Sequence, residues 1–259
     1  VATVSHADRE TPGFLGRLSA VLAPAGLGVS CDIQSTDETL DWQALATPCD
    51  FVIIEGYDEH AMLDAPGPIS SMDWYRDVIE RAVRKVPSSK LVVGLGNYAY
   101  DWPDKHEAES MTYLEAVLRA RDRRPGESPD SVVNFDPAAL NPTYNYDDDA
   151  GKSHEVWMLD GVTAGNQMRL ARAQGVRRFA LWVLGSEDPS VWSLLGAARR
   201  DTMPGLEGLK TIEFPYDVEF LGDGEVLSVA EHPKTGHREL DVDPSTGICT
   251  DERYIEYPT

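Results

Sequence analysis

A group of acidic and phenolic residues follows one strongly apolar segment of the chain. Residues 51–54, FVII, are apolar without alternation, and Glu55, Tyr57 and Asp58 come directly after them. Such a run is typical of a parallel strand that is buried on both faces. Carboxylates and a phenol at the carboxyl end of a strand can hydrogen-bond a ligand and stabilise charge that develops on it. The alternative is an ordinary buried strand that continues into a solvated loop.

Aromatic residues follow two further apolar segments. The segment KLVVGL at 90–95 leads to Tyr98 and Trp102, and the segment FALWVLG at 179–185 contains Trp182. Aromatic side chains this dense just past a strand favour the wall of a ligand site. A packed loop is the alternative for the first group, and a core-facing position in a buried strand is the alternative for Trp182.

The elements that would position these residues alternate between strands and helices. Apolar runs near 27–33, 50–57, 90–96 and 178–184 predict core strands. Helical patterns lie between them, one after a cap at Thr11 with Pro12 in its first turn, and another after a cap at Ser71. This order predicts a parallel α/β architecture. No strand is followed by a G-x-G-x-x-G or phosphate-binding loop, which argues against a nucleotide-binding fold.

Two parts of the sequence depart from this alternation. Residues 103–153 are expected to be the least regular part, with one helix over 110–121 and a polar loop that contains three aspartates at 147–149. These aspartates could bind a cation, but an acidic turn is the commoner structure and the spacing does not fit an EF-hand loop. Turn signals at 222–224, 233–236 and 243–247 separate short alternating runs, which predicts an antiparallel meander over 212–257. We therefore divide the chain into residues 1–205 and 206–259.

The strongly acidic composition limits the kinds of partner that the chain can bind. The chain has 44 acidic and 23 basic residues and a formal net charge of −21. This charge repels phosphate backbones and anionic membranes, so we expect neither nucleic acid nor membrane insertion. No apolar run approaches the roughly 18–20 residues that span a bilayer. The chain starts at Val1 rather than Met, which indicates a processed or trimmed N-terminus, and the acidic balance favours a secreted or cell-envelope protein.

The three cysteines give no framework for a disulfide or a metal site. Cys31, Cys49 and Cys249 are odd in number and widely spaced, and no Cys/His spacing typical of a metal site is present. Cys31 and Cys49 lie in or beside apolar runs, where we expect them to pack as small hydrophobic residues. We predict neither a metal nor another cofactor.

Four motifs together carry a family resemblance. DFVIIEGYDEH, KLVVGLGNYAYDW, HEVWMLDGVTAGNQMRLARAQGV and FALWVLGSEDPSVW resemble, in this order, the C-terminal half of glycoside hydrolase family 18. The branch that they resemble contains bacterial spore-cortex hydrolases and domains fused to deacetylase or glycosyltransferase modules. The resemblance implies a TIM-type (β/α) barrel in which 50–57, 90–96 and 178–184 are the sixth, seventh and eighth strands. It also implies cleavage of β-1,4 links next to N-acetylglucosamine, in chitin or peptidoglycan glycan, with the substrate's acetamide oxygen as nucleophile.

The resemblance also implies roles for individual residues. Tyr57 and Asp58 would be the catalytic residues: Tyr57 would contact the acetamide group, and Asp58 would support the sugar hydroxyls or Tyr57. Trp182 would be the floor on which the sugar ring stacks. Further substrate contacts would come from Glu55, which stands where the family commonly has Met, and from Tyr98 and Trp102.

One part of the family pattern is absent from this sequence. The general acid of the family lies in a D-x-x-D-x-D-x-E motif, and no such motif occurs here. By register the acid would fall near Ala2 or upstream of Val1, so we expect the first four barrel strands and the proton donor to be missing and this chain alone to be inactive. Its partner would then be a glycan together with a second copy or the missing N-terminal half. A non-catalytic carbohydrate-binding or scaffolding module of the same fold is the alternative, and the coding sequence upstream of Val1 discriminates between the two.

Overall fold

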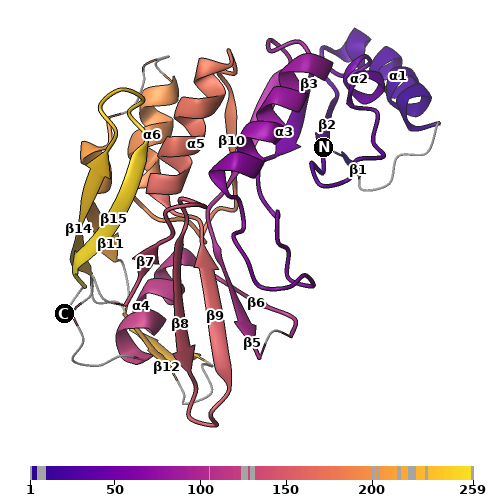
Figure 1. Ribbon diagram of the computed structural model, residues 1–259. Coiled ribbons are helices and arrows are strands. Elements are labelled where there is room, and N and C mark those ends of the chain that lie inside the picture. Colours follow the sequence, from indigo (N-terminus) through magenta and orange to yellow (C-terminus); the bar gives the residue numbers. More distant parts are fainter. Residues whose placement is uncertain are drawn as a thin grey trace.

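The computed structural model describes residues 2–4, 10–104, 106–123, 128, 132–199, 202, 205–214, 217–220, 226–230 and 233–257. Figure 1 shows a parallel sheet with helices beside it, an antiparallel sheet below, and a group of C-terminal strands next to α5 and α6. Among the described residues, no helix has the length and apolar character needed to cross a membrane.

The central element is a five-stranded parallel sheet. Its strand order is β1 (Ala2–Val4), β2 (Ser30–Ile33), β3 (Phe51–Glu55), β4 (Leu91–Gly96) and β10 (Phe179–Trp182). All four neighbouring pairs are parallel, so the carboxyl ends of the strands meet at one edge. The four predicted core strands are confirmed as β2, β3, β4 and β10, each somewhat shorter than its apolar run, and the mixed α/β class is confirmed with them.

Helices cover one face of this sheet. The buried residues Val52 and Ile54 of β3 pack in a core cluster with side chains of α1 (Thr11–Leu22), α2 (Trp42–Ala46), α3 (Met72–Lys85) and α5 (Gly161–Ala173). Burial alternates along β3, and Ile53 and Glu55 on the opposite face are only partly buried. The prediction of a strand buried on both faces is therefore wrong for the described part of the chain, because helices lie on one face only.

The helix ends follow local capping chemistry. The side chain of Ser71 accepts a hydrogen bond from Trp74 N and caps α3, as predicted. The carboxylate of Glu59, which follows β3, in turn accepts from the backbone N and the hydroxyl of Ser71. Helix α1 begins at Thr11, with Glu10 at the cap position and no side-chain cap bond, so the predicted Thr11 cap is wrong. The 3-10 turn η1 (Ala23–Ala25) follows α1, as Pro24 and Gly26 stop the helix.

An antiparallel sheet is inserted between β4 and β10. It contains β5 (Ala99–Pro103), β6 (Glu109–Met111), β7 (Asn134–Phe135), β8 (Pro142–Asp147) and β9 (Ser153–Met158), in the order β6-β5-β9-β8-β7. Helix α4 (Tyr113–Arg123) packs against it and confirms the helix predicted over 110–121. The prediction that 103–153 is otherwise irregular is wrong, because β8 and β9 form a regular hairpin.

The acidic stretch at 147–149 is the turn of that hairpin. Asp148 Oδ1 accepts hydrogen bonds from Ala150 N at 2.9 Å and from Lys152 N at 2.8 Å. These backbone bonds hold the pKa of Asp148 below its usual value. Among the described residues, no group of three or more His, Cys, Asp or Glu could hold a metal ion.

The C-terminal strands form two separate sheets. After α6 (Val191–Arg199) and the turn η3 (Glu207–Leu209), β11 (Thr211–Phe214), β14 (Lys234–Val242) and β15 (Cys249–Glu256) form one antiparallel sheet in the order β11-β14-β15. β12 (Asp217–Phe220) pairs only with β13 (Val226–Ala230) among the described strands, so the single predicted meander is wrong in topology. The turn predicted at 222–224 lies outside the described residues. All three cysteines are buried and are free thiols.

Candidate functional site

The carboxyl edge of the parallel sheet brings two predicted site residues together. Tyr57 follows β3, and Trp182 ends β10, with β4 between the two strands. The centroids of their rings are 6.5 Å apart, and the ring planes differ by 18°. This is the geometry of an offset aromatic pair. Residues that are 125 positions apart in sequence thus form one aromatic surface at the end of the sheet.

Two glycines of β4 make room for the Tyr57 side chain. A Cβ atom on Gly94 would lie 3.0 Å from Tyr57 Cε1, and one on Gly96 would lie 3.0 Å from Tyr57 Cβ. Any larger residue at these positions would push the phenol away from β4. Gly96 also pairs in register with Trp182 on the other side of the strand. The glycines in VVGLG therefore allow Tyr57 to reach across β4 towards Trp182.

Trp182 presents its ring to solvent, whereas Tyr57 is buried. The side chain of Trp182 is 53% exposed and that of Tyr57 is 5% exposed. The core-facing alternative for Trp182 is therefore contradicted. The peptide bond between Trp182 and Val183 is cis. The carbonyl oxygen of Trp182 accepts a hydrogen bond from Asn97 N at 2.8 Å, which fixes the end of β10 to the residue that follows β4.

Asp58 is held by two phenols from the start of the inserted sheet. Its Oδ1 accepts from the hydroxyl of Tyr98 at 2.5 Å and from that of Tyr100 at 3.0 Å. Its backbone has a φ of 63°, the left-handed region that Asp tolerates better than most residues. Burial raises the pKa of Asp58, while the two phenol hydrogen bonds lower it by a smaller amount. The Asp58 carboxylate is thus fixed in position beside Tyr57.

Two further carboxyl groups lie on the partly exposed face of the sheet. Burial, with the nearby charges of Asp32 and then Asp58, raises the pKa of Glu55 to about 7. Burial also raises the pKa of Asp32, and its Oδ1 is buried without a hydrogen-bond partner among the described residues. Asp32 was not among the predicted site residues; its place at the end of β2 was the only signal in the sequence. Glu55 can therefore hold a proton near neutral pH at this edge.

Tyr57 remains a hydrogen-bond donor in this environment. Burial raises the pKa of its hydroxyl well above the usual value, and the charges of Glu55, Asp32 and Asp58 raise it further. Its hydroxyl makes no hydrogen bond to another described residue. A neutral phenol in this position can donate to an acceptor atom of a ligand.

The predicted role of Trp102 is wrong. Its side chain is fully buried, and its Nε1 donates to the carbonyl oxygen of Asp64 at 3.0 Å. The inserted sheet and the loop after β3 enclose this indole, so its face is not available to a ligand. Tyr98 is also buried, at 4% exposure, and its hydroxyl is bound to Asp58. Tyr98 therefore holds the Asp58 carboxylate and does not present its ring to a ligand. Tyr100, which we did not predict, also donates to this carboxylate.

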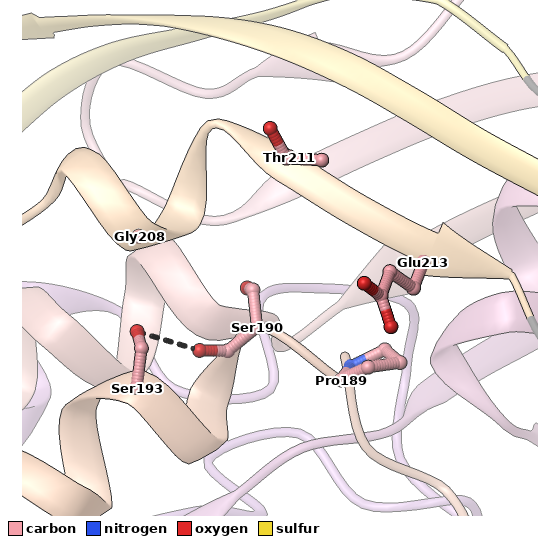
Figure 2. A pocket seen from close by; sticks show the side chains of 6 residues that line it. All are labelled: Pro189, Ser190, Ser193, Gly208, Thr211 and Glu213. Carbon is pink, nitrogen blue, oxygen red and sulfur yellow. Dashed lines mark hydrogen bonds between the residues drawn. The ribbon is translucent and has the colours of Figure 1, made fainter.

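A separate cavity lies beside α6. Figure 2 shows its lining, which comes from the residues just before α6, from the first turn of α6, from η3 and from β11, and its volume is about 330 Å³. The side chain of Ser193 donates to the carbonyl oxygen of Ser190, three residues earlier, at 2.9 Å. None of the predicted site residues lines it, so the cavity is distinct from the carboxyl edge that carries Tyr57 and Trp182.

Several known proteins are similar to this chain in sequence and in fold. No family model matches the chain. The cortical fragment-lytic enzyme of Bacillus anthracis is 30% identical over 163 residues, which cover 61% of this chain and 36% of that enzyme. The spore cortex-lytic enzyme SleL of Bacillus cereus matches with 27% identity and a TM-score of 0.65 over 76% of this chain and 47% of that one. The resemblance to glycoside hydrolase family 18 is thereby confirmed.

A chitinase structure also shares the fold of this chain. A chitinase from Chromobacterium violaceum ATCC 12472 superposes with a TM-score of 0.63 at 24% identity, over 73% of this chain and 60% of that one. The chain spans between 36% and 44% of the length of the curated relatives that it matches. Glycosylases and cortex-lytic enzymes are thus similar to this chain over less than half of their own length.

Proposed function

We propose that this chain is a glycoside hydrolase-like protein that acts on or binds β-1,4-linked N-acetylglucosamine polymers, such as chitin or peptidoglycan glycan. The observation that carries the proposal is the pair formed by Tyr57 and Trp182 at the carboxyl edge, an exposed indole face beside a buried phenol. An indole face matches the apolar face of a pyranose ring. The cortex-lytic relatives make a glycan the best-supported ligand class.

Each site residue has its own role in a substrate-assisted reaction. The sugar ring stacks on Trp182, and the Tyr57 hydroxyl donates to the acetamide oxygen of that sugar. The acetamide oxygen attacks the anomeric carbon, the bond to the leaving oxygen breaks, and a proton passes to that oxygen from a general acid. The cyclic intermediate is positively charged, and the fixed carboxylate of Asp58 stabilises it. The charge of Glu55 acts on the hydroxyl of Tyr57, so the protonation state of Glu55 changes the charge of the site.

The finer architecture is part of the same proposal. The strands β2, β3, β4 and β10 are the last four strands of a TIM-type barrel, and residues 206–259 are a C-terminal β extension packed on residues 1–205. Strand β1 pairs in parallel with β2, so it takes the place of the preceding barrel strand, which we expected to be missing. The partly exposed side chains of Ile53 and Glu55 support this, since in a closed barrel they point into the lumen. The likeness to chitinase and SleL structures, at TM-scores of 0.63 and 0.65, supports it as well.

A non-catalytic carbohydrate-binding or scaffolding module is the second candidate. The D-x-x-D-x-D-x-E motif, which carries the general acid of the family, is absent from this sequence. Tyr57 and Trp182 can bind a sugar without a proton donor. Both candidates therefore predict glycan binding, and they differ in turnover.

Two measurements test the proposal. Calorimetry with N-acetylglucosamine tetramer is expected to show binding to the chain, and no binding at millimolar ligand would refute both candidates. Release of the fluorophore from a fluorogenic chitobioside is expected only from a chain extended upstream of Val1 to include the acid motif. Binding without turnover in the extended chain would support the second candidate, a non-catalytic carbohydrate-binding or scaffolding module.

A further inference from the structure

Arg238 of β14 is buried at the junction between the C-terminal sheet and the rest of the chain. Its guanidinium lies 3.2 Å from a carboxylate oxygen of Asp160, 2.8 Å from one of Asp188 and 2.8 Å from one of Glu252. It also donates to the hydroxyl of Ser190 at 2.7 Å. The side chain is completely excluded from solvent, as are the three carboxyl groups apart from a trace of Glu252. A guanidinium presents five N–H donors in a fixed planar fork, whereas an ammonium group has only three donors and no such fork.

Asp188 connects Arg238 to the loop that follows β10. One of its carboxylate oxygens accepts from Arg238 and from Gly161 N at 2.9 Å, and the other accepts from Ser190 N at 2.9 Å. Its backbone N donates to Oδ1 of Asn97 at 2.6 Å. The residue is therefore held on both its side chain and its backbone, and the loop over 183–190 has little freedom at this point.

Asn97 completes the connection to the sugar site. It is fully buried and stands directly before Tyr98. Its backbone N donates to the carbonyl oxygen of Trp182 at 2.8 Å, while its side chain accepts from Asp188. A continuous chain of contacts thus runs from Arg238 through Asp188 and Asn97 to the backbone of Trp182.

A second contact holds the same loop from α4. The backbone N of Tyr113 donates to the carbonyl oxygen of Ser186 at 2.8 Å. The hydroxyl of Tyr113 contacts Arg238 at 3.3 Å and also the hydroxyl of Tyr254 of β15. Both routes from the C-terminal sheet therefore end on the segment that begins with Trp182.

We propose that Arg238 is a positioning residue for Trp182, so that the C-terminal sheet is an integral part of the sugar site rather than an appended module. Arg238 fixes Asp188, Asp188 and Asn97 fix the end of β10, and the indole of Trp182 is thereby held beside Tyr57. The role in sugar binding rests on the proposed function. The effect on the position of Trp182 does not, and it can be measured without a ligand.

The test uses the whole chain labelled with 5-fluorotryptophan, with the Trp182 signal assigned by its loss in Trp182→Phe. We expect Arg238→Lys to shift or broaden the Trp182 ¹⁹F resonance by more than its line width. The matched control is Arg119→Lys, because Arg119 is also a buried arginine, 2.7 Å from the carboxylate of Asp101, but it lies in α4 and pairs with β5 of the inserted sheet instead of with the C-terminal sheet. A structural role alone predicts that both variants lose stability and that neither moves the Trp182 signal.

A second variant covers the case in which Arg238→Lys does not fold. Asn97→Ala removes the acceptor for Asp188 N while Arg238 and its three carboxylates stay intact, and it is expected to move the same resonance. An unchanged Trp182 signal in the folded variants, or an equal change in Arg119→Lys, would overturn the proposal. The affinity for N-acetylglucosamine tetramer is expected to fall about tenfold with the signal change. Absence of sugar binding in the unmutated chain refutes the proposed function alone, since the fluorine result is independent of it.

Discussion

Replacing Glu55 by Gln tests whether burial and nearby charges destabilise the ionised carboxylate of Glu55 in the folded protein. Burial and the charges of Asp32 and Asp58 raise its pKa from 4.5 to about 7. A shift of this size corresponds to at most about 3.4 kcal/mol of differential stability. The side chain is only partly buried, so solvent screening reduces the expected effect to about 1–2 kcal/mol. Gln keeps the shape of the protonated acid but cannot ionise.

The direction of the effect follows from proton linkage. The folded state holds the Glu55 proton more tightly than the unfolded chain, because the pKa in the fold is the higher of the two. The stability that this proton confers is present below about pH 4.5 and is lost as the pH rises through about 7. Glu55→Gln is therefore expected to match the unmutated protein at pH 4 and to exceed its stability at pH 8.

Urea unfolding at pH 4 and pH 8 measures this difference. The matched control is Glu213→Gln, which removes the charge of an exposed glutamate on β11 and is expected to change stability by less than about 0.5 kcal/mol at either pH. A Glu55→Gln effect that is equal at the two pH values, or a less stable variant at pH 8, would refute the assignment of a desolvated carboxyl group to this edge.

Three further substitutions separate binding, catalysis and packing. Trp182→Ala is expected to weaken binding of N-acetylglucosamine tetramer by about 1–3 kcal/mol, on the scale of stacking on aromatic side chains, and unchanged affinity in calorimetry would exclude the stacking floor. Tyr57→Phe in a chain that carries the acid motif is expected to lower turnover of a fluorogenic chitobioside by about 10²–10³, and turnover equal to that of the unmutated enzyme would count against the donor role. Trp102→Ala is expected to lower the free energy of unfolding by about 3–5 kcal/mol, because it empties a fully buried site. If the folded Trp102→Ala protein loses affinity for the sugar while its stability is unchanged, the indole contacts the ligand after all.

The parts of the fold that were predictable are those with a strong local signal. Unbroken apolar runs gave β3 and β4, and the serine at 71 marked the start of α3. Adjacent parallel strands bring their carboxyl ends together, so the meeting of Tyr57 and Trp182 at one edge could be anticipated from the order of the strands.

The parts that were missed depend on contacts between distant segments. The sequence PTYNYD at 142–147 is too polar to stand out as a strand, although Tyr144 and Tyr146 are buried in alternation. In the sequence, Trp102 comes soon after the apolar run at 90–96, as Tyr98 does. The structure places it within β5, and only the tertiary fold shows that the loop after β3 covers it. Burial on one face of β3 likewise depends on which helices pack against the sheet, which periodicity alone does not reveal.

A crystal structure of the chain with N-acetylglucosamine tetramer would test the sugar site most directly. We predict a pyranose ring stacked on the indole of Trp182, with the acetamide oxygen of that sugar within hydrogen-bond distance of the Tyr57 hydroxyl. A tetramer bound elsewhere on the surface, with Trp182 and Tyr57 free of ligand, would contradict the assignment.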